Sequence, residues 1–141
     1  MYSFTTHLPH PTDFSHLVTR IAQSSHGAFY RHREGNIGRV LWVNGQPRFV
    51  DVGLCEVDAR LLEVTVYDGT KADESAVSEL VSHLFSLETD LPAFYQHSAH
   101  DPKLQRLVTR LSGARMLRDA DLFSSVISSI ISQQINLKFA S

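Results

Sequence analysis

The chain has 141 residues, of which 43% are hydrophobic, and a formal net charge of −2. This length suits one domain, or one domain and part of a second, and the apolar content is sufficient for a buried core. The charge excludes a protein that is basic over its whole surface, although a DNA-binding protein needs only a local basic surface.

The sequence also predicts a compartment and excludes several kinds of site. Its one cysteine, Cys55, cannot form an internal disulfide and therefore fits a reducing environment. No apolar run reaches the length of a membrane span, and no signal peptide is present, so we expect a cytoplasmic protein without a membrane partner. Eight histidines include His7 with His10 and His97 with His100, but no cysteine or carboxylate completes a ligand set. We therefore expect neither a metal nor another cofactor.

Residues 1–72 have the alternating pattern of a β-rich domain. The expected strands are 2–6, 28–33, 38–43, 47–56 and 61–67. Asn44-Gly45 is a strong signal for a two-residue hairpin between the third and fourth of these strands. Thr12 is expected to cap a short helix over residues 12–24. The inward face of this helix would consist of Phe14, Leu17, Val18 and Ile21. We expect an antiparallel sheet of four or five strands with this helix packed on one face.

Residues 73–141 have a helical pattern, which makes them a second segment. The expected helices are 75–87, 92–99, 101–111 and a last one that begins after Asp119 or Asp121. Asp101-Pro102 is typical of a helix start, and Gly113 is expected to stop that helix. Strands followed by helices predict the α+β fold class.

The last helix carries a broad apolar stripe that ends in polar residues. The stripe consists of Leu122, Phe123, Val126, Ile127, Ile130 and Ile131. Ser132, Gln133, Gln134 and Asn136 then interrupt it. Amide side chains donate and accept hydrogen bonds and are long enough to probe a stacked duplex. Periodicity alone favours an ordinary core helix with a polar C-terminal turn.

Two long segments resemble a known family. They are LPAFYQHSAHDPKLQRLVTRLSGARML (residues 91–117) and SSVISSIISQQINLKFA (residues 124–140). Both resemble the central region of the 3-methyladenine DNA glycosylase II family, within the helix-hairpin-helix superfamily of DNA repair glycosylases. The resemblance runs from about Ser86 to Ser141. It is carried by Phe94, Tyr95, Asp101, Pro102, Leu104, the Leu-Ser-Gly break at 111–113 and the double glutamine. The opening MYSFTTHLPHPTDFSHLV also resembles that of the family.

The resemblance implies a fold and an activity. The fold would be a small antiparallel sheet with helices, similar to half of a TATA-box-binding protein, followed by the first helices of an all-α core. The parent protein would bind double-stranded damaged DNA, flip an alkylated purine of the 3-methyladenine type and excise it with water. Gln134 would fill the gap that the flipped nucleotide leaves, and Gln133, Ile135 and Asn136 would shape the same loop.

The resemblance also implies base-pocket residues and leaves catalysis to a later segment. Phe14 is a candidate for the damaged-base pocket, and Arg20 stands where a family member can carry an aromatic side chain. The family's hairpin and catalytic aspartate follow the glutamine loop. We therefore expect an N-terminal fragment without a catalytic residue, inactive alone, whose incompletely covered last helix pairs with a second copy. Asp119 and Asp121 are better explained as caps of that helix.

A second interpretation stays open, in which the chain is a non-catalytic module that binds DNA or another protein. Lys103, Arg106 and Arg110 lie on one face of their predicted helix and could contact phosphates, although a solvated surface face is the favoured explanation. Arg115 and Arg118 precede the last helix, and the sequence does not assign them a role.

Overall fold

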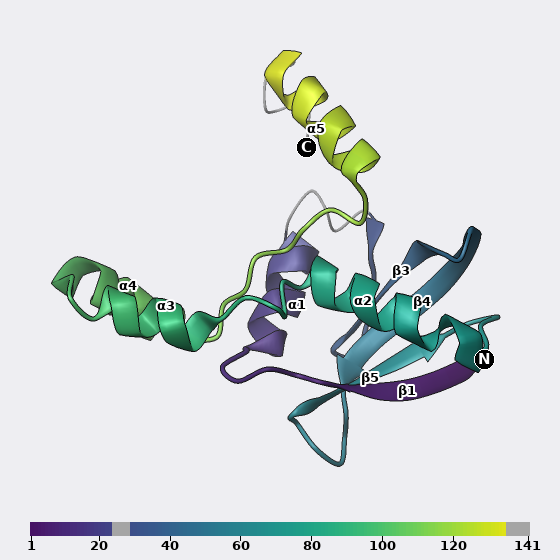
Figure 1. Cartoon of the computed structure of the whole chain (residues 1–141), viewed down its shortest axis with the longest axis horizontal. Helices are drawn as coiled ribbons and strands as arrows, with labels where there is room; N and C mark the ends of the chain where they lie inside the picture. Colours follow the sequence, from purple (N-terminus) through teal and green to yellow (C-terminus); the bar gives the residue numbers. More distant parts are fainter. Residues whose placement is uncertain (24–28, 135–141) are drawn as a thin grey trace.

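The fold is a five-stranded antiparallel sheet covered on one face by two helices (Figure 1). It comes from a computed structural model that describes residues 1–23 and 29–134. The strands are β1 (Tyr2–His7), β2 (Arg31–Arg33), β3 (Asn36–Val43), β4 (Gln46–Leu54) and β5 (Leu61–Val66). Their order across the sheet is β1-β5-β4-β3-β2. The predicted sheet, its antiparallel pairing and the α+β fold class are confirmed.

Six helical elements are described. They are α1 (Phe14–Gln23), the 3-10 turn η2 (Lys71–Asp73), α2 (Glu74–Leu84), α3 (Leu91–Ser98), α4 (Pro102–Arg110) and α5 (Leu122–Gln134). The helices α1 and α2 lie against the sheet, whereas α3 and α4 form a helical hairpin at one end and α5 projects separately (Figure 1). In the described residues, no helix is long and apolar enough to cross a membrane.

The hairpin between β3 and β4 forms as predicted. Asn44 and Gly45 both have positive φ, 51° and 76°, as a two-residue turn of the type I′ requires. Val43 then pairs with Gln46, and this register turns Leu41 and Val43 into the core. Val40 and Trp42 alternate with these two residues along β3, lie on the open face of the sheet and are exposed.

The core fills the space between the sheet and its two helices. It contains Leu17 and Ile21 from α1, Val77, Val81 and Leu84 from α2, and Leu62, Val64 and Val66 from β5, together with residues of β3 and β4. Phe14 packs edge-on against Phe85, with ring centroids 6.0 Å apart and an interplanar angle of 86°. Burial of this apolar surface is the main favourable contribution to folding.

Several predicted boundaries differ from the structure. Thr12 does not cap α1; the Asp13 carboxylate accepts the His16 amide at 2.9 Å instead. The Thr12 hydroxyl is engaged elsewhere, because it accepts a hydrogen bond from the Arg115 guanidinium at 2.6 Å. The described part of the predicted strand 28–33 is shortened to Arg31–Arg33, and β3 begins earlier than expected, directly after the turn at 34–35. The helix predicted for residues 75–87 ends at Leu84, and Ser86 adopts a φ of 52°.

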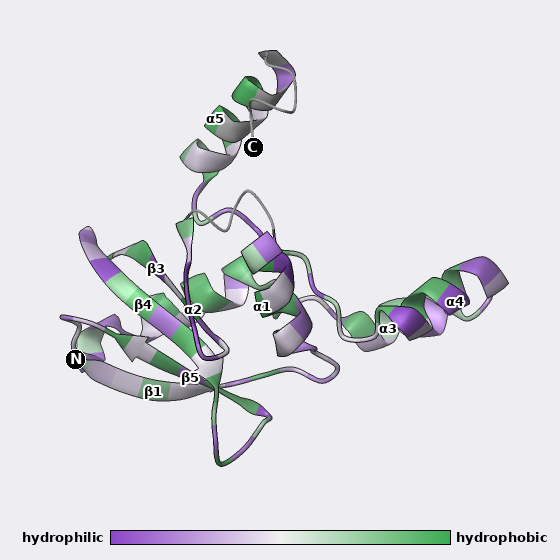
Figure 2. Ribbon diagram, turned by 180° about the vertical axis from the view of Figure 1, so that it is seen from behind, coloured by the Kyte–Doolittle hydropathy of each residue, from purple (hydrophilic) through white to green (hydrophobic). Residues whose placement is uncertain are grey.

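The apolar stripe of α5 is exposed along its length, unlike the inward faces of α1 and α2. Figure 2 shows that α5 projects away from the sheet and these two helices. Exposure ranges from 40% at Ile127 to 80% at Leu122. The described part of the chain thus offers no cover for this face, and the interpretation of α5 as an ordinary core helix does not hold for these residues.

Pairing of α5 with a second copy stays a prediction. It follows from the exposed stripe, because association would remove its apolar surface from water. Sedimentation velocity should show a dimer that Val126→Asp disrupts. A monomer at micromolar concentration with an unchanged sedimentation coefficient in the variant would contradict the pairing.

A buried carboxylate joins the β3–β4 hairpin to the start of α2. Asp73 accepts the Thr70 amide at 3.0 Å and the Asn44 side-chain amide at 3.1 Å, and the Arg48 Nε lies 3.8 Å from it. The Thr70 amide contributes most to lowering the pKa of Asp73, followed by Asn44 and the positive charge of Arg48.

This pKa predicts a pH-dependent contribution to stability. Because the folded pKa is lowered, the contribution is present above the unfolded pKa of about 4 and is lost as the pH falls through the folded value. Asp73→Asn should therefore be less stable than the wild type at pH 7, and the difference should shrink as the pH falls below about 4. Urea unfolding at pH 7, 5 and 3 measures it. A difference that is the same at all three values would contradict this role.

Candidate nucleic-acid interface

A connector, defined as residues 111–121, runs from α4 past α1 to the start of α5 (Figure 1). Backbone hydrogen bonds fix it at two points: the Asp13 amide donates to the Gly113 carbonyl, and the Arg118 amide donates to the Leu84 carbonyl, both at 2.9 Å. Leu117 and Ala120 pack against the core. The connector therefore sets where α5 begins relative to the sheet and its helices.

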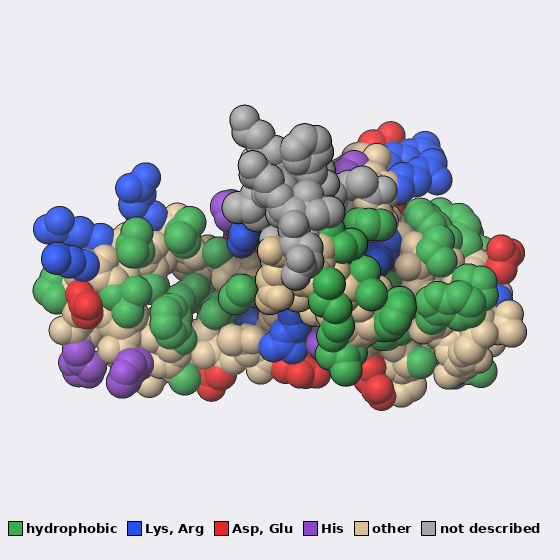
Figure 3. Space-filling model, turned by 90° about the horizontal axis from the view of Figure 1, so that it is seen from above, with side chains coloured by type: hydrophobic (Ala, Val, Ile, Leu, Met, Phe, Trp, Pro, Cys, Tyr) green, Lys and Arg blue, Asp and Glu red, His purple; other side chains and the backbone are tan. Residues whose placement is uncertain are grey.

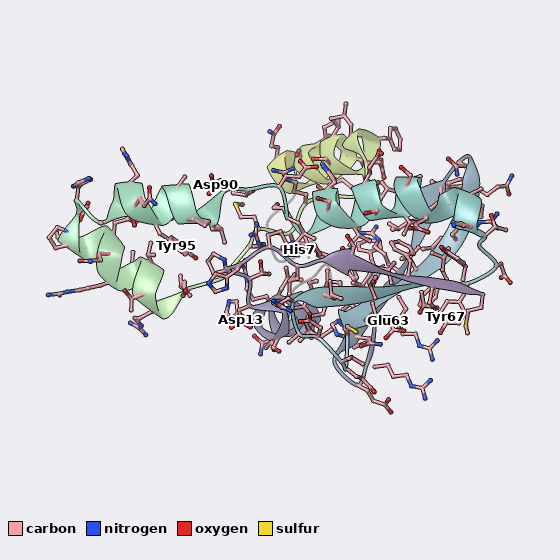
Figure 4. All side chains as sticks on the ribbon, turned by 60° about the horizontal axis from the view of Figure 1, so that its bottom comes forward. His7, Asp13, Glu63, Tyr67, Asp90 and Tyr95 are labelled. Atoms are coloured by element: carbon pink, nitrogen blue, oxygen red, sulfur yellow. The ribbon has the colours of Figure 1, made fainter. Side chains whose placement is uncertain are left out.

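Tyr95 fixes the end of the α3–α4 hairpin to the connector. Its ring lies on the side of α3 that faces α4 (Figure 4). The Gly113 amide donates to the Tyr95 hydroxyl at 2.9 Å. The Leu-Ser-Gly break at residues 111–113 therefore connects the α3–α4 hairpin to the start of α1.

Arg115 is the central polar residue of the connector and is only 4% exposed. Its guanidinium donates to the Thr12 hydroxyl at 2.6 Å and to the carbonyl oxygens of Pro11, Ser86, Leu87 and Thr89 at 2.7–3.5 Å. These acceptors come from the segment before α1 and from the loop between α2 and α3. Burial lowers the pKa of Arg115. Even so, a guanidinium remains charged at neutral pH.

The connector and α1 together form a pocket of about 400 Å³, which we call the junction pocket. Its apolar lining consists of Leu17, Ile21, Met116 and Leu117. The polar lining consists of Arg20, Gln23, Arg115, Arg118 and Asp119. Residues of α1 and of the connector, far apart in sequence, thus share one concave surface at the base of α5.

The junction pocket carries unneutralised positive charge. Three arginines line it against one carboxylate, that of Asp119. Within residues 1–23 and 29–134, no guanidinium of Arg20, Arg115 or Arg118 lies within 4.0 Å of a carboxylate. Because Arg20 and Arg118 are exposed, their charged groups can meet a ligand from solution.

The residues predicted for the base pocket and for the DNA-binding loop lie in different parts of the structure. Arg20 lines the junction pocket, whereas Phe14 is 3% exposed in the core and does not line it. Gln133 is exposed in the last turn of α5, and Gln134 is the last residue of that helix. The Gln134 side chain and residues Ile135 and Asn136 lie outside the described residues. The 13 residues of α5 span about 20 Å, so the glutamines lie far from the pocket.

The last helix begins with a cap that the sequence predicted. The Asp121 carboxylate accepts the Ser124 amide at 2.8 Å and the Ser124 hydroxyl at 2.7 Å. The hydrogen bond from the Ser124 amide is the main reason that the pKa of Asp121 is lowered. Asp119 lies in the connector instead, where its carbonyl oxygen is 3.2 Å from the His83 ring nitrogen.

Other basic residues lie apart from the pocket. Lys103, Arg106 and Arg110 are exposed on α4, and basic side chains gather at the end of the molecule that contains α3 and α4 (Figure 3). In the described ranges, none of the three forms an ion pair, as expected for a solvated face. A search of the same residues finds no group of His, Cys, Asp or Glu that could hold a metal ion.

Comparison with known families places the chain among DNA glycosylases. A sequence model of the family "8-oxoguanine DNA glycosylase, N-terminal domain" matches residues 14–125. The chain belongs to this family. The resemblance to DNA glycosylases seen in the sequence is thereby confirmed. The match crosses the boundary predicted at residue 72, and α2, which follows that boundary, packs on the sheet. The division into 1–72 and 73–141 stays a prediction.

Two solved structures share the fold of this chain, and the names of the similar proteins describe related activities. The DNA-3-methyladenine glycosylase of Bacillus subtilis (strain 168) is 24% identical over 94% of this chain and 45% of its own length. The 3-methyladenine DNA-glycosylase of Archaeoglobus fulgidus superposes with a TM-score of 0.81, at 20% identity, over 97% of this chain and 46% of that one. The 8-oxoguanine glycosylase/lyase of Clostridium acetobutylicum has a TM-score of 0.63 at 20% identity, over 99% and 44%. The chain spans about half the length of these relatives.

Proposed function

We propose that this chain is the N-terminal unit of a DNA glycosylase that removes damaged purines from duplex DNA in base excision repair. The observation that carries the proposal is the family match over residues 14–125. The sheet, α1 and the connector would then support α5 at the DNA. The chemistry would be hydrolysis of the N-glycosidic bond after the nucleotide is flipped out of the stack.

The lesion in this proposal is an alkylated purine of the 3-methyladenine type. Two relatives, from Bacillus subtilis and Archaeoglobus fulgidus, are named for 3-methyladenine, and both align with nearly the whole of this chain. The family description and the Clostridium acetobutylicum protein name 8-oxoguanine instead. The two lesions are therefore the substrates to compare.

Base release by the protein in which these residues occur tests the proposal. Duplexes that contain 3-methyladenine or 8-oxoguanine are incubated with protein from a host that lacks its own glycosylases, and the free base is measured. Release of 3-methyladenine in excess of 8-oxoguanine is the expected result. Release of 8-oxoguanine alone would replace the lesion but keep the enzyme class, whereas release of neither would contradict the function.

The proposal gives the end of α5 a specific task. Exposed Gln133 and its neighbour Gln134 end a helix that projects from the rest of the molecule (Figure 1). A side chain that enters the emptied position has to fill space and to hydrogen-bond the orphaned partner base. An amide meets both demands because it donates and accepts.

Gln134→Ala should therefore slow excision from duplex DNA, with a loss of about 1–3 kcal/mol by analogy with alanine substitutions at base-stacking contacts. Excision of the same lesion from a single strand should change much less, because no stack is opened there. Single-turnover rates on the two substrates provide the comparison, with Gln105→Ala on exposed α4 as a control of the same residue type. Equal slowing on both substrates would indicate a structural role at the helix end.

A further inference from the structure

Among the described residues, the arginines of the junction pocket have no carboxylate within 4.0 Å. Arg20 and Arg118 are exposed, Arg115 is buried in the lining, and Asp119 is the one carboxylate of the lining. The acceptors of Arg115 are a hydroxyl and backbone carbonyls, which carry partial charges and do not neutralise it. An anion at this site would be attracted by the exposed guanidiniums of Arg20 and Arg118.

This charge disfavours the ligand that the sequence suggested for Arg20. A purine methylated at N3 or N7 in a nucleoside carries a positive charge, and a pocket with three arginines repels it. A phosphate group has the opposite charge, and its oxygens match the planar fork of a guanidinium. The pocket chemistry therefore suits the DNA backbone better than the alkylated base.

We propose that the junction pocket binds a phosphodiester group of duplex DNA. Arg20 and Arg118 make the direct contacts from α1 and from the connector, and Gln23 supplies a neutral donor. This inference rests on the proposed function, because that function supplies DNA as the source of the phosphate. The overall charge of −2 is compatible with it, since a phosphate contact needs only a local group of basic residues.

The position of the pocket relative to Gln134 indicates which part of the DNA binds there. The pocket lies at the start of α5, whereas Gln134 ends that helix about 20 Å away. Base pairs are stacked about 3.4 Å apart, so this length covers several nucleotide steps. The phosphate therefore belongs to the flanking duplex and not to the extruded nucleotide. Binding there fixes the orientation of α5 on the DNA without reading its sequence.

Salt-dependent binding of undamaged duplex tests the site separately from excision. Anisotropy of a fluorescein-labelled duplex is measured for the full chain from 50 to 200 mM KCl. For R20Q/R118Q, the slope of log K against log[KCl] should become less negative by about 0.9, because the two arginines together neutralise one phosphate and each neutralised phosphate contributes about 0.9. The variant R20K/R118K should keep most of the slope. The matched control R106Q/R110Q removes two exposed arginines from α4 and should leave the slope unchanged.

A slope unchanged in R20Q/R118Q, an equal reduction in the α4 control, or no duplex binding by the wild type overturns the inference. Inorganic phosphate is titrated in parallel, with the Nε signals of Arg20 and Arg118 followed by NMR. Signals that respond to phosphate but not to duplex would assign the site to free phosphate and overturn the DNA assignment. Failure of base release with an intact salt response would instead remove the proposed lesion chemistry and keep the phosphate site.

Discussion

Replacement of Arg115 with methionine should lower the free energy of unfolding by about 2–4 kcal/mol, because hydrogen bonds to a charged group contribute about 1.5–3 kcal/mol and buried acceptors are left without their donor. The side chain is 4% exposed and donates to acceptors on two segments of the chain, the one before α1 and the loop between α2 and α3. Methionine fills much of the same space but offers no donor. The carbonyl oxygens of Ser86 and Thr89 would lose their hydrogen bonds to the guanidinium.

Urea unfolding measures this loss, and Arg118→Met is the matched control. Arg118 lies three positions further along the same connector, but its side chain is exposed, so its replacement should cost about 0.5 kcal/mol or less. Arg115→Lys should recover only part of the stability, because an ammonium group cannot span the same set of acceptors. Equal losses in Arg115→Met and Arg118→Met would show that the hydrogen bonds of Arg115 do not stabilise the fold.

Gly113→Ala should lower the free energy of unfolding by about 2–4 kcal/mol. Gly113 has a φ of 78°, which costs an L-residue about 1–2 kcal/mol. An added Cβ would also lie 2.6 Å from the Asp13 backbone nitrogen, which donates to the Gly113 carbonyl at 2.9 Å. Relief of that clash requires the connector to move away from α1.

Gly45→Ala separates the two causes. Gly45 has nearly the same φ, 76°, but an added Cβ would meet nothing within 4 Å. Thermal or urea unfolding should therefore show a smaller loss for Gly45→Ala, about 1–2 kcal/mol. Amide exchange in the connector should accelerate in Gly113→Ala and not in Gly45→Ala. Equal destabilisation by the two substitutions would show that the approach of the connector to α1 contributes nothing.

Features that depend on neighbouring residues could be predicted from the sequence. The Asn44-Gly45 hairpin, the Asp121 cap and the start of α4 at Asp101-Pro102 all follow from contacts within a few positions. Asp101 accepts the amides of Lys103 and Leu104, as a residue before a helix does. The same rule predicted Thr12 as the cap of α1, but the Thr12 hydroxyl accepts a hydrogen bond from Arg115, 103 positions away.

The candidate site could not be predicted from contacts between residues that are close in the sequence. The glutamines of α5 were found through resemblance, because a helical pattern that ends in amides has no functional meaning by itself. The junction pocket needs Arg20 and Arg115, which are 95 positions apart, to lie side by side. Neither the overall charge nor the spacing of arginines along the sequence predicts that Arg20 and Arg115 lie close together. The incomplete cover of the α5 stripe was expected from the resemblance, whereas its helical periodicity alone favoured a buried core helix.

Disulfide trapping on DNA is the most direct test of base extrusion at the end of α5. Gln134→Cys is made in a Cys55→Ser background, because Cys55 is the single native cysteine. The protein is then mixed with duplexes that carry a thiol-tethered base either opposite an alkylated purine or several pairs away. Cross-linking should form opposite the lesion and be weak at the distant tether, with Gln105→Cys unreactive at both. Equal cross-linking at the two tethers, or none with Gln134→Cys, would contradict the insertion of α5 beside a flipped nucleotide.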